Sequence, residues 1–120
     1  MSARELLELA AKAAGYTTHG YGELVGGEPC LLLKEADFTG MWAPLTDDGD
    51  ALRLAVKLRI DVIHNDLQDN DGWVMAGPDM DCVEDVDGEG SRPAATRRAI
   101  VRAAALQAPG AEHAPTQRTT

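Results

Sequence analysis

Three stretches of this chain space their apolar residues as helices do, and short apolar or β-branched runs lie between them. The helical stretches follow Ser2, the pair Thr46 and Asp47, and Ser91. Apolar residues that recur every three or four positions form one face of a helix, whereas short β-branched runs are typical of strands. Because short polar turns join consecutive strands, we predict an α+β fold with three helices and an antiparallel sheet.

The start of each of the first two helices is marked in the sequence. Ser2, with Glu5 three residues later, forms a capping-box pattern, and Gly15 ends this first helical run. Thr46 or Asp47 is suited to cap the second helix. Apolar residues cover a broad face of that second helix, so we expect it to be the most buried of the three.

Ser91 is suited to cap the third helix. Pro93 then lies in the first turn, where the amide hydrogen that proline lacks has no partner within the helix. Its apolar period stops at Pro109, and the residues beyond have no period of their own. We therefore expect a single domain over residues 1–107 and a disordered tail over residues 108–120.

Short runs between the helices predict four strands, or five if the first run also forms a strand. The runs are Tyr21–Val25, Cys30–Lys34, Ile60–His64, Trp73–Ala76 and Cys82–Val86. The last three follow one another across short loops and predict a meander. The expected order is α-β(β)-α-β-β-β-α, and the expected architecture is a small αβα sandwich around one antiparallel sheet.

The charge balance excludes two broad classes of partner. Acidic residues outnumber Lys plus Arg by 20 to 11, which gives a formal net charge of −9. A general nucleic-acid binder needs a basic surface, and so does a protein that docks on an anionic membrane. The chain also lacks a basic, apolar leader at its start and any apolar run near 20 residues. We therefore expect a cytoplasmic protein that binds neither nucleic acid nor membrane directly.

No residue pattern typical of catalysis stands out. His19, His64 and His113 are far apart in the sequence, and Cys30 and Cys82 match no metal-ligand spacing. We expect both cysteines to be buried as small hydrophobic residues, without a disulfide. We accordingly expect no enzymatic activity and no cofactor.

Glycines and acidic loops also fail the tests for known ligand motifs. Gly20, Gly22, Gly26 and Gly27 do not form a phosphate-binding loop and are interpreted as turn residues. No acidic stretch has the acids, the glycine and the final glutamate of an EF-hand loop at their required positions. Weak binding of a divalent cation by the acidic loops, or a small enzyme activity, stays as an alternative.

Charge is divided unevenly along the chain. Residues 61–90 hold ten acids and no Lys or Arg, whereas residues 92–120 hold five Arg against one acid. One-sided charge steers association with a partner of opposite charge. The candidate partner surface is therefore the acidic set Asp66, Asp69, Asp71, Asp79, Asp81, Glu84, Asp85 and Asp87.

Two interpretations of this acidic set stay open. In the first, it is a decoy that occupies the nucleic-acid groove of a basic host protein. In the second, it is a solvated surface to which the arginines of the last helix bridge. Trp42 and Trp73 leave a similar choice, because either ring packs in or beside the core or serves as an exposed anchor for a partner.

Three segments of the chain resemble one family of small proteins. Residues 42–55, WAPLTDDGDALRLA, resemble the segment W-x-P-L-x-D-D-G-D-A-L-x-L-A of the phage ABA-sandwich domain family. Residues 6–15 and 94–105 resemble its opening and closing helices, so that the likeness spans residues 4–107. The resemblance implies a phage or prophage origin, a small α/β sandwich and action in the bacterial cytoplasm. The family has no assigned activity, so the resemblance implies no site residues.

These observations together predict a non-enzymatic accessory protein of a phage or prophage that acts by protein contact. The partner is expected to be basic if the acidic surface is used, and the chain itself to be a monomer or weak homodimer. The acidic decoy and the cation-binding protein or small enzyme are the alternatives.

Overall fold

The computed structural model confirms the α+β class. It describes residues 2–24, 26–34, 40–64, 72–77, 82–86 and 91–109. The helices of this described part are α1 (Ala3–Ala13), α2 (Asp48–Leu58) and α3 (Ser91–Leu106). Its strands are β1 (Thr18–Glu23), β2 (Pro29–Leu33), β3 (Met41–Trp42), β4 (Val62–His64), β5 (Trp73–Ala76) and β6 (Cys82–Asp85).

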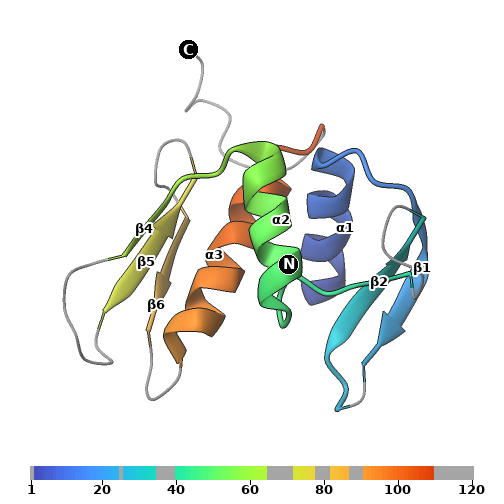
Figure 1. Cartoon of the computed structure of the whole chain (residues 1–120), viewed down its shortest axis with the longest axis horizontal. Helices are drawn as coiled ribbons and strands as arrows, with labels where there is room; N and C mark the ends of the chain where they lie inside the picture. The colour runs from blue at the N-terminus through green and yellow to red at the C-terminus, as the bar shows by residue number, and fades with distance from the viewer. Residues whose placement is uncertain are drawn as a thin grey trace.

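The strands form two antiparallel sheets, in the orders β1-β2-β3 and β4-β5-β6. The sheets lie on opposite sides of the helices (Figure 1). The predicted meander is confirmed, but the expectation of one sheet with four or five strands was wrong. Since α2 separates the two sets of strands in the sequence, each set pairs locally and covers its own side of a shared helical layer.

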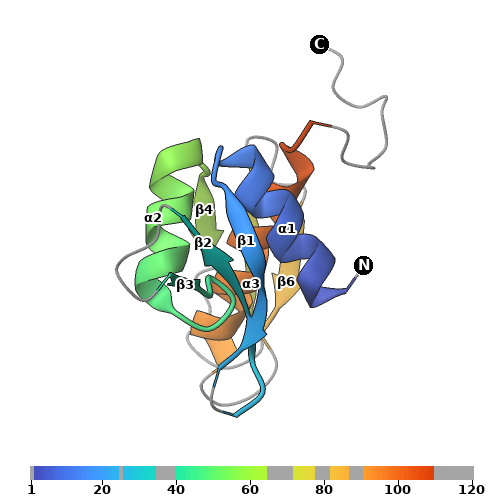
Figure 2. The same ribbon diagram turned by 90° about the vertical axis from the view of Figure 1, so that its right-hand side faces the viewer.

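Helix α3 is the centre of the molecule, because it packs against α1, α2 and the sheet β4-β5-β6. Helix α1 in turn packs against β2, so the order across the molecule is sheet, helices, sheet (Figure 1), and not the expected αβα sandwich. Figure 2 views these layers from the side of β1 and β2. Small side chains permit this close packing. Ala10 and Ala11 of α1 and Ala99 and Ala104 of α3 are all fully buried.

Helix α2 is not the most buried helix, contrary to the expectation from its broad apolar face. Leu52 and Val56 are 63% and 66% exposed, although Ala51, Leu54 and Ala55 of the same helix are buried. The helix packs against α3 and presents its outer side to solvent. The apolar residues of a helix are candidates for burial. How many of them are buried depends on how many other elements pack against the helix.

Two further strand features depart from the sequence prediction. Met41–Trp42 forms strand β3, which is not among the predicted strands. Gly20 and Gly22 lie inside β1, whereas Gly26 and Gly27 sit in the turn with positive φ. Pairing with β2 provides hydrogen bonds for the backbone of β1, and this tertiary gain outweighs the weak strand propensity of glycine.

The predicted starts of the first two helices are confirmed, whereas α3 begins at Ser91 itself, one residue before the start that a cap at Ser91 predicts. Ser2 and Glu5 form the capping box, and the Asp47 side chain accepts a hydrogen bond of 2.8 Å from the Asp50 amide. Helix α3 begins at Ser91, so Pro93 lies in its first turn. Of the tail predicted over residues 108–120, the part from residue 110 onward lies outside the described residues.

Candidate functional site

The structure describes two members of the predicted acidic surface, Glu84 and Asp85, both on β6. Asp85 is exposed, and the Glu84 side chain is 16% exposed and lies toward α3. The other members lie outside the described residues; they are Asp66, Asp69, Asp71, Asp79, Asp81 and Asp87.

Glu84 is bound by two arginines of α3. Arg98 Nε donates to Glu84 Oε1 at 2.9 Å, and Arg102 Nη1 donates to Oε2 at 2.6 Å. Arg102 also donates to the carbonyl of Val83 at 3.1 Å. Burial disfavours the charged carboxylate, but the hydrogen bonds from Arg98 and Arg102 outweigh it and lower the pKa of Glu84. Glu84 therefore fits the interpretation in which arginines of the last helix bridge to the acidic surface, and its charge is compensated within the chain.

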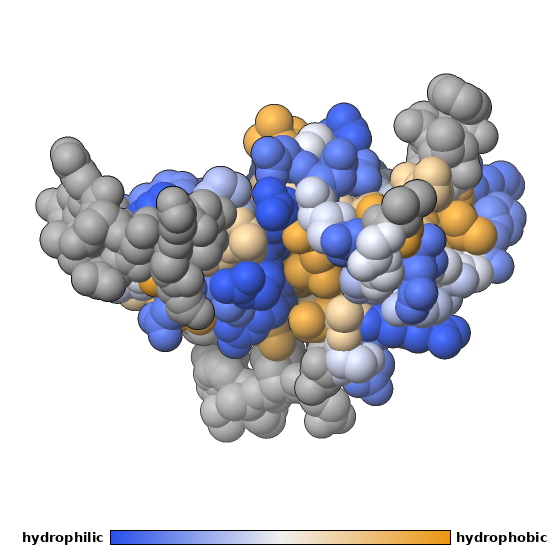
Figure 3. Space-filling model, turned by 90° about the horizontal axis from the view of Figure 1, so that it is seen from below, coloured by the Kyte–Doolittle hydropathy of each residue, from blue (hydrophilic) through white to orange (hydrophobic). Residues whose placement is uncertain are grey.

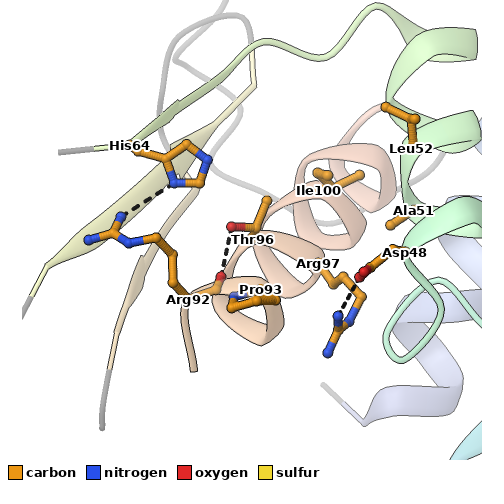
Figure 4. Close-up of a pocket in the computed structure, with 9 residues that line it drawn as sticks. All are labelled: Asp48, Ala51, Leu52, His64, Arg92, Pro93, Thr96, Arg97 and Ile100. Carbon is orange, nitrogen blue, oxygen red and sulfur yellow. Dashed lines mark hydrogen bonds and ion pairs between the residues drawn. The ribbon is translucent and has the colours of Figure 1, made fainter. Parts of the chain in front are cut away.

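An open groove of about 380 Å³ lies between α2 and the end of β4, with α3 as its floor (Figure 4). Both α2 and β4 pack against α3, which leaves the space between them open over the floor. The lining residues are Asp48, Ala51, Leu52, His64, Arg92, Pro93, Thr96, Arg97 and Ile100. The sequence did not predict that these residues come together in one site.

Arg97 is held between the floor and the α2 wall of the groove. Its Nε donates to the carbonyl of Leu45 at 2.9 Å, and its Nη1 lies 2.5 Å from Asp48 Oδ1. The Arg97 side chain is 18% exposed, whereas that of Asp48 is 81% exposed. The cation is therefore fixed and largely desolvated, while its carboxylate partner stands in solvent.

Arg92 stands on the opposite, β4 side of the groove. Its Nη1 lies 3.3 Å from His64 Nδ1 and 3.4 Å from the carbonyl oxygen of Trp73. A guanidinium has only donors, so Arg92 donates to the carbonyl of Trp73. The Thr96 hydroxyl donates to the Arg92 carbonyl at 2.8 Å. Two arginines from α3 thus flank a floor that contains Pro93 and the apolar Ile100.

Hydrophobic side chains remain uncovered beside this groove. Leu52 lines the groove and Val56 follows it by four residues along α2, and both are more than half exposed. On the face seen in Figure 3, hydrophobic atoms likewise gather near the centre, bordered by hydrophilic ones. Exposed apolar surface next to fixed charges is typical of a contact site.

The sequence did not reveal this groove because its parts are far apart in the chain. Arg97 and Asp48 are separated by 49 positions, and Arg92 and His64 by 28. The sequence contained one indication of the groove. The apolar face of α2 is broader than a helix needs when it packs on one side only, so some of its apolar residues stay exposed.

The cysteines behave as predicted, as buried residues with free thiols. Burial, and next to it the negative charge of Glu23, raises the pKa of Cys30. A thiol with a raised pKa is a poor nucleophile at neutral pH, so the geometry does not favour Cys30 as a reactive group.

The two tryptophans differ in burial. Trp42 is 4% exposed and meets the ring of Tyr16 edge-on, with 5.6 Å between ring centroids. Trp73 is half-buried on β5 and is not part of the core cluster. The interpretation as a core residue is therefore confirmed for Trp42.

Within the described ranges, no three His, Cys, Asp or Glu side chains are grouped so that they could hold a metal ion. His19 is exposed on β1, and His113 lies outside the described residues. No helix of the described part is long and apolar enough to cross a membrane.

Comparisons of this chain with protein-family models, with curated proteins and with solved structures found no match. The likeness to the phage ABA-sandwich domain family accordingly rests on the sequence segments quoted above.

Proposed function

We propose that this chain is a small binding protein that acts by contact with a partner protein, and that the groove over α3 is its contact site. The observation that carries this proposal is the combination of an open apolar groove, two arginines that flank it and the exposed Leu52 and Val56 at its rim. An apolar surface that continues along a groove and is rimmed by polar side chains is typical of a protein contact site.

The polar groups of the groove support binding more than chemistry. The Thr96 hydroxyl is engaged with a carbonyl of its own helix, and Arg97 ties the floor to the α2 wall. Asp48 and His64 stand on opposite walls, without a hydrogen bond between them (Figure 4). Such groups fix the shape and charge of a site, whereas a catalytic pair needs a base within reach of a nucleophile.

An accessory role in a phage or prophage is part of the same proposal. The segment that resembles the phage family, residues 42–55, includes three residues of the α2 wall: Asp48, Ala51 and Leu52. The most specific part of the sequence therefore contributes directly to the proposed contact site. Within this proposal the protein works in the cytoplasm of a bacterial host.

A photo-crosslinking amino acid placed at position 52 tests the proposal in cells of the bacterium that carries the gene. We expect irradiation to give a discrete covalent adduct with another protein, identified by mass spectrometry. The matched control is the same crosslinker at Glu8, which is exposed on α1. Absence of an adduct at position 52, or identical adducts from both positions, would contradict the proposed contact site.

A further inference from the structure

We infer that the groove recognises a protein segment in which an acidic side chain stands beside apolar ones, and that Arg97 binds the acidic group. This inference rests on the proposed function and adds the chemistry of the partner. It also reverses the expectation from the total charge, because an acidic chain would here accept an acidic partner segment at one cationic site.

The state of Arg97 is the first reason. Its guanidinium is held by the Leu45 carbonyl and is largely buried, so a ligand meets it already in position. Its present carboxylate, on Asp48, is 81% exposed. Exposed ion pairs contribute little, whereas a carboxylate shielded from water inside the groove gains a stronger charge-assisted hydrogen bond. An incoming acidic side chain is therefore able to replace Asp48.

The balance of charge in the groove is the second reason. Among the lining residues that the structure describes, Arg92 and Arg97 are cationic and stand on two sides of the groove, and Asp48 is acidic. Of these charged groups, Arg97 is the one that the groove holds fixed and largely buried, inside a chain of net charge −9. A basic segment would meet repulsion at this place, whereas an acidic one is attracted.

The extent of the apolar surface is the third reason, and it favours a peptide over a small molecule. Leu52 lies in the groove, and Val56 continues the apolar surface about 6 Å further along α2, as the helical rise requires. Pro93 and Ile100 add apolar surface on the floor. A segment of several residues is long enough to cover Val56 while its acidic side chain reaches Arg97.

Selection from a random 12-residue peptide library displayed on cells, with the purified full chain as bait, tests the inference. We expect the enriched peptides to pair Asp or Glu with a nearby aliphatic or aromatic residue. A synthetic peptide of the enriched sequence, and its Asn or Gln counterpart, are then titrated by fluorescence polarisation. We expect the loss of the carboxylate to weaken binding about tenfold or more.

Two variants of the chain should change the affinity in opposite directions. Asp48→Asn removes the internal competitor for Arg97, so we expect the acidic peptide to bind about threefold to tenfold more tightly. Leu52→Gln removes an exposed apolar contact without changing charge, and we expect binding about fivefold weaker. Arg4→Gln is the control, because Arg4 is an exposed arginine on α1, outside the groove; we expect unchanged affinity.

A gain of affinity in Asp48→Asn is a result that mere damage to the fold would not give. Enriched peptides that are basic or uncharged, no enrichment at all, or weaker binding by Asp48→Asn would overturn the inference. So would an adduct at position 52 that consists only of a second copy of this chain. If these peptide experiments fail but the crosslinker at position 52 still gives an adduct with another protein, only the further inference is wrong. If the crosslinker gives no adduct, the proposed contact function is wrong as well.

Discussion

At the scale of single residues, the arginines of α3 decide how the acidic charge of the chain is used. Arg98 and Arg102 hold Glu84, and Arg97 holds Asp48 across a groove wall. Glu84 is half-buried, whereas the Asp48 side chain is exposed. The first pairing links β6 to α3, and the second holds Arg97 against α2.

Glu84→Gln should show the contribution of the buried pairing. The lowered pKa of Glu84 means that the ion pairs stabilise the fold above the ordinary glutamate pKa and lose this effect as the pH falls below it. We expect the variant to lose about 1 kcal/mol of unfolding free energy at pH 7. Urea unfolding at a series of pH values should show the difference from the wild type shrinking below about pH 4.3.

Glu8→Gln is the matched control for that measurement. Glu8 pairs with Arg4 on α1, where both side chains are well exposed. We expect a change of less than about 0.5 kcal/mol at pH 7. Equal losses in the two variants would show that burial against α3 adds nothing to the Glu84 pairing.

At the scale of elements, α2 has two kinds of apolar residue only two positions apart. Leu54 is fully buried against the core, whereas Leu52 is exposed at the groove. The helix owes its place in the fold to the first kind and its proposed contact surface to the second.

Substitutions at these two leucines should therefore separate stability from binding. We expect Leu54→Ala to cost about 2–5 kcal/mol of unfolding free energy, because it leaves a cavity in the core. Leu52→Ala should stay within about 0.5 kcal/mol of the wild type, since it removes a side chain already in water. Thermal unfolding followed by circular dichroism measures both, and similar losses would contradict the orientation of α2.

At the scale of the whole molecule, α3 joins two sheets that do not pair with each other. The buried residues of both sheets and of all three described helices form one core cluster, with α3 in its middle. One sheet reaches α3 through α1, and the other packs on it directly. Neither sheet buries its inner face without this helical layer.

Cooperative unfolding of both sheets follows from this arrangement. Trp42 belongs to the sheet of β1–β3 and Trp73 to the sheet of β4–β6. In the variant Trp73→Phe, the fluorescence of Trp42 reports on the sheet of β1–β3. In Trp42→Phe, the fluorescence of Trp73 reports on the sheet of β4–β6. We expect the fluorescence midpoint in urea to coincide with the circular dichroism midpoint in each variant. Separate midpoints in either variant would show that the sheets unfold independently.

The sequence predicted those features that depend on near neighbours in the chain. Ser2 and Glu5 indicated the first capping box, Asp47 indicated the second cap, and short β-branched runs indicated the meander. Each of these rests on hydrogen bonds or side-chain alternation within a few residues, so local chemistry is sufficient to determine it.

Only the tertiary structure decided the layer order and the candidate site. Whether the described strands form one sheet or two depends on which faces of the strands and helices pack against each other. The periodicity of the sequence shows only that each element has an apolar face. The groove likewise depends on side chains that α2, α3 and β4 bring together from distant positions, such as Arg97 and Asp48. Charge composition indicated an acidic protein, and the packing of α3 placed Arg92 and Arg97 beside an apolar groove on its surface.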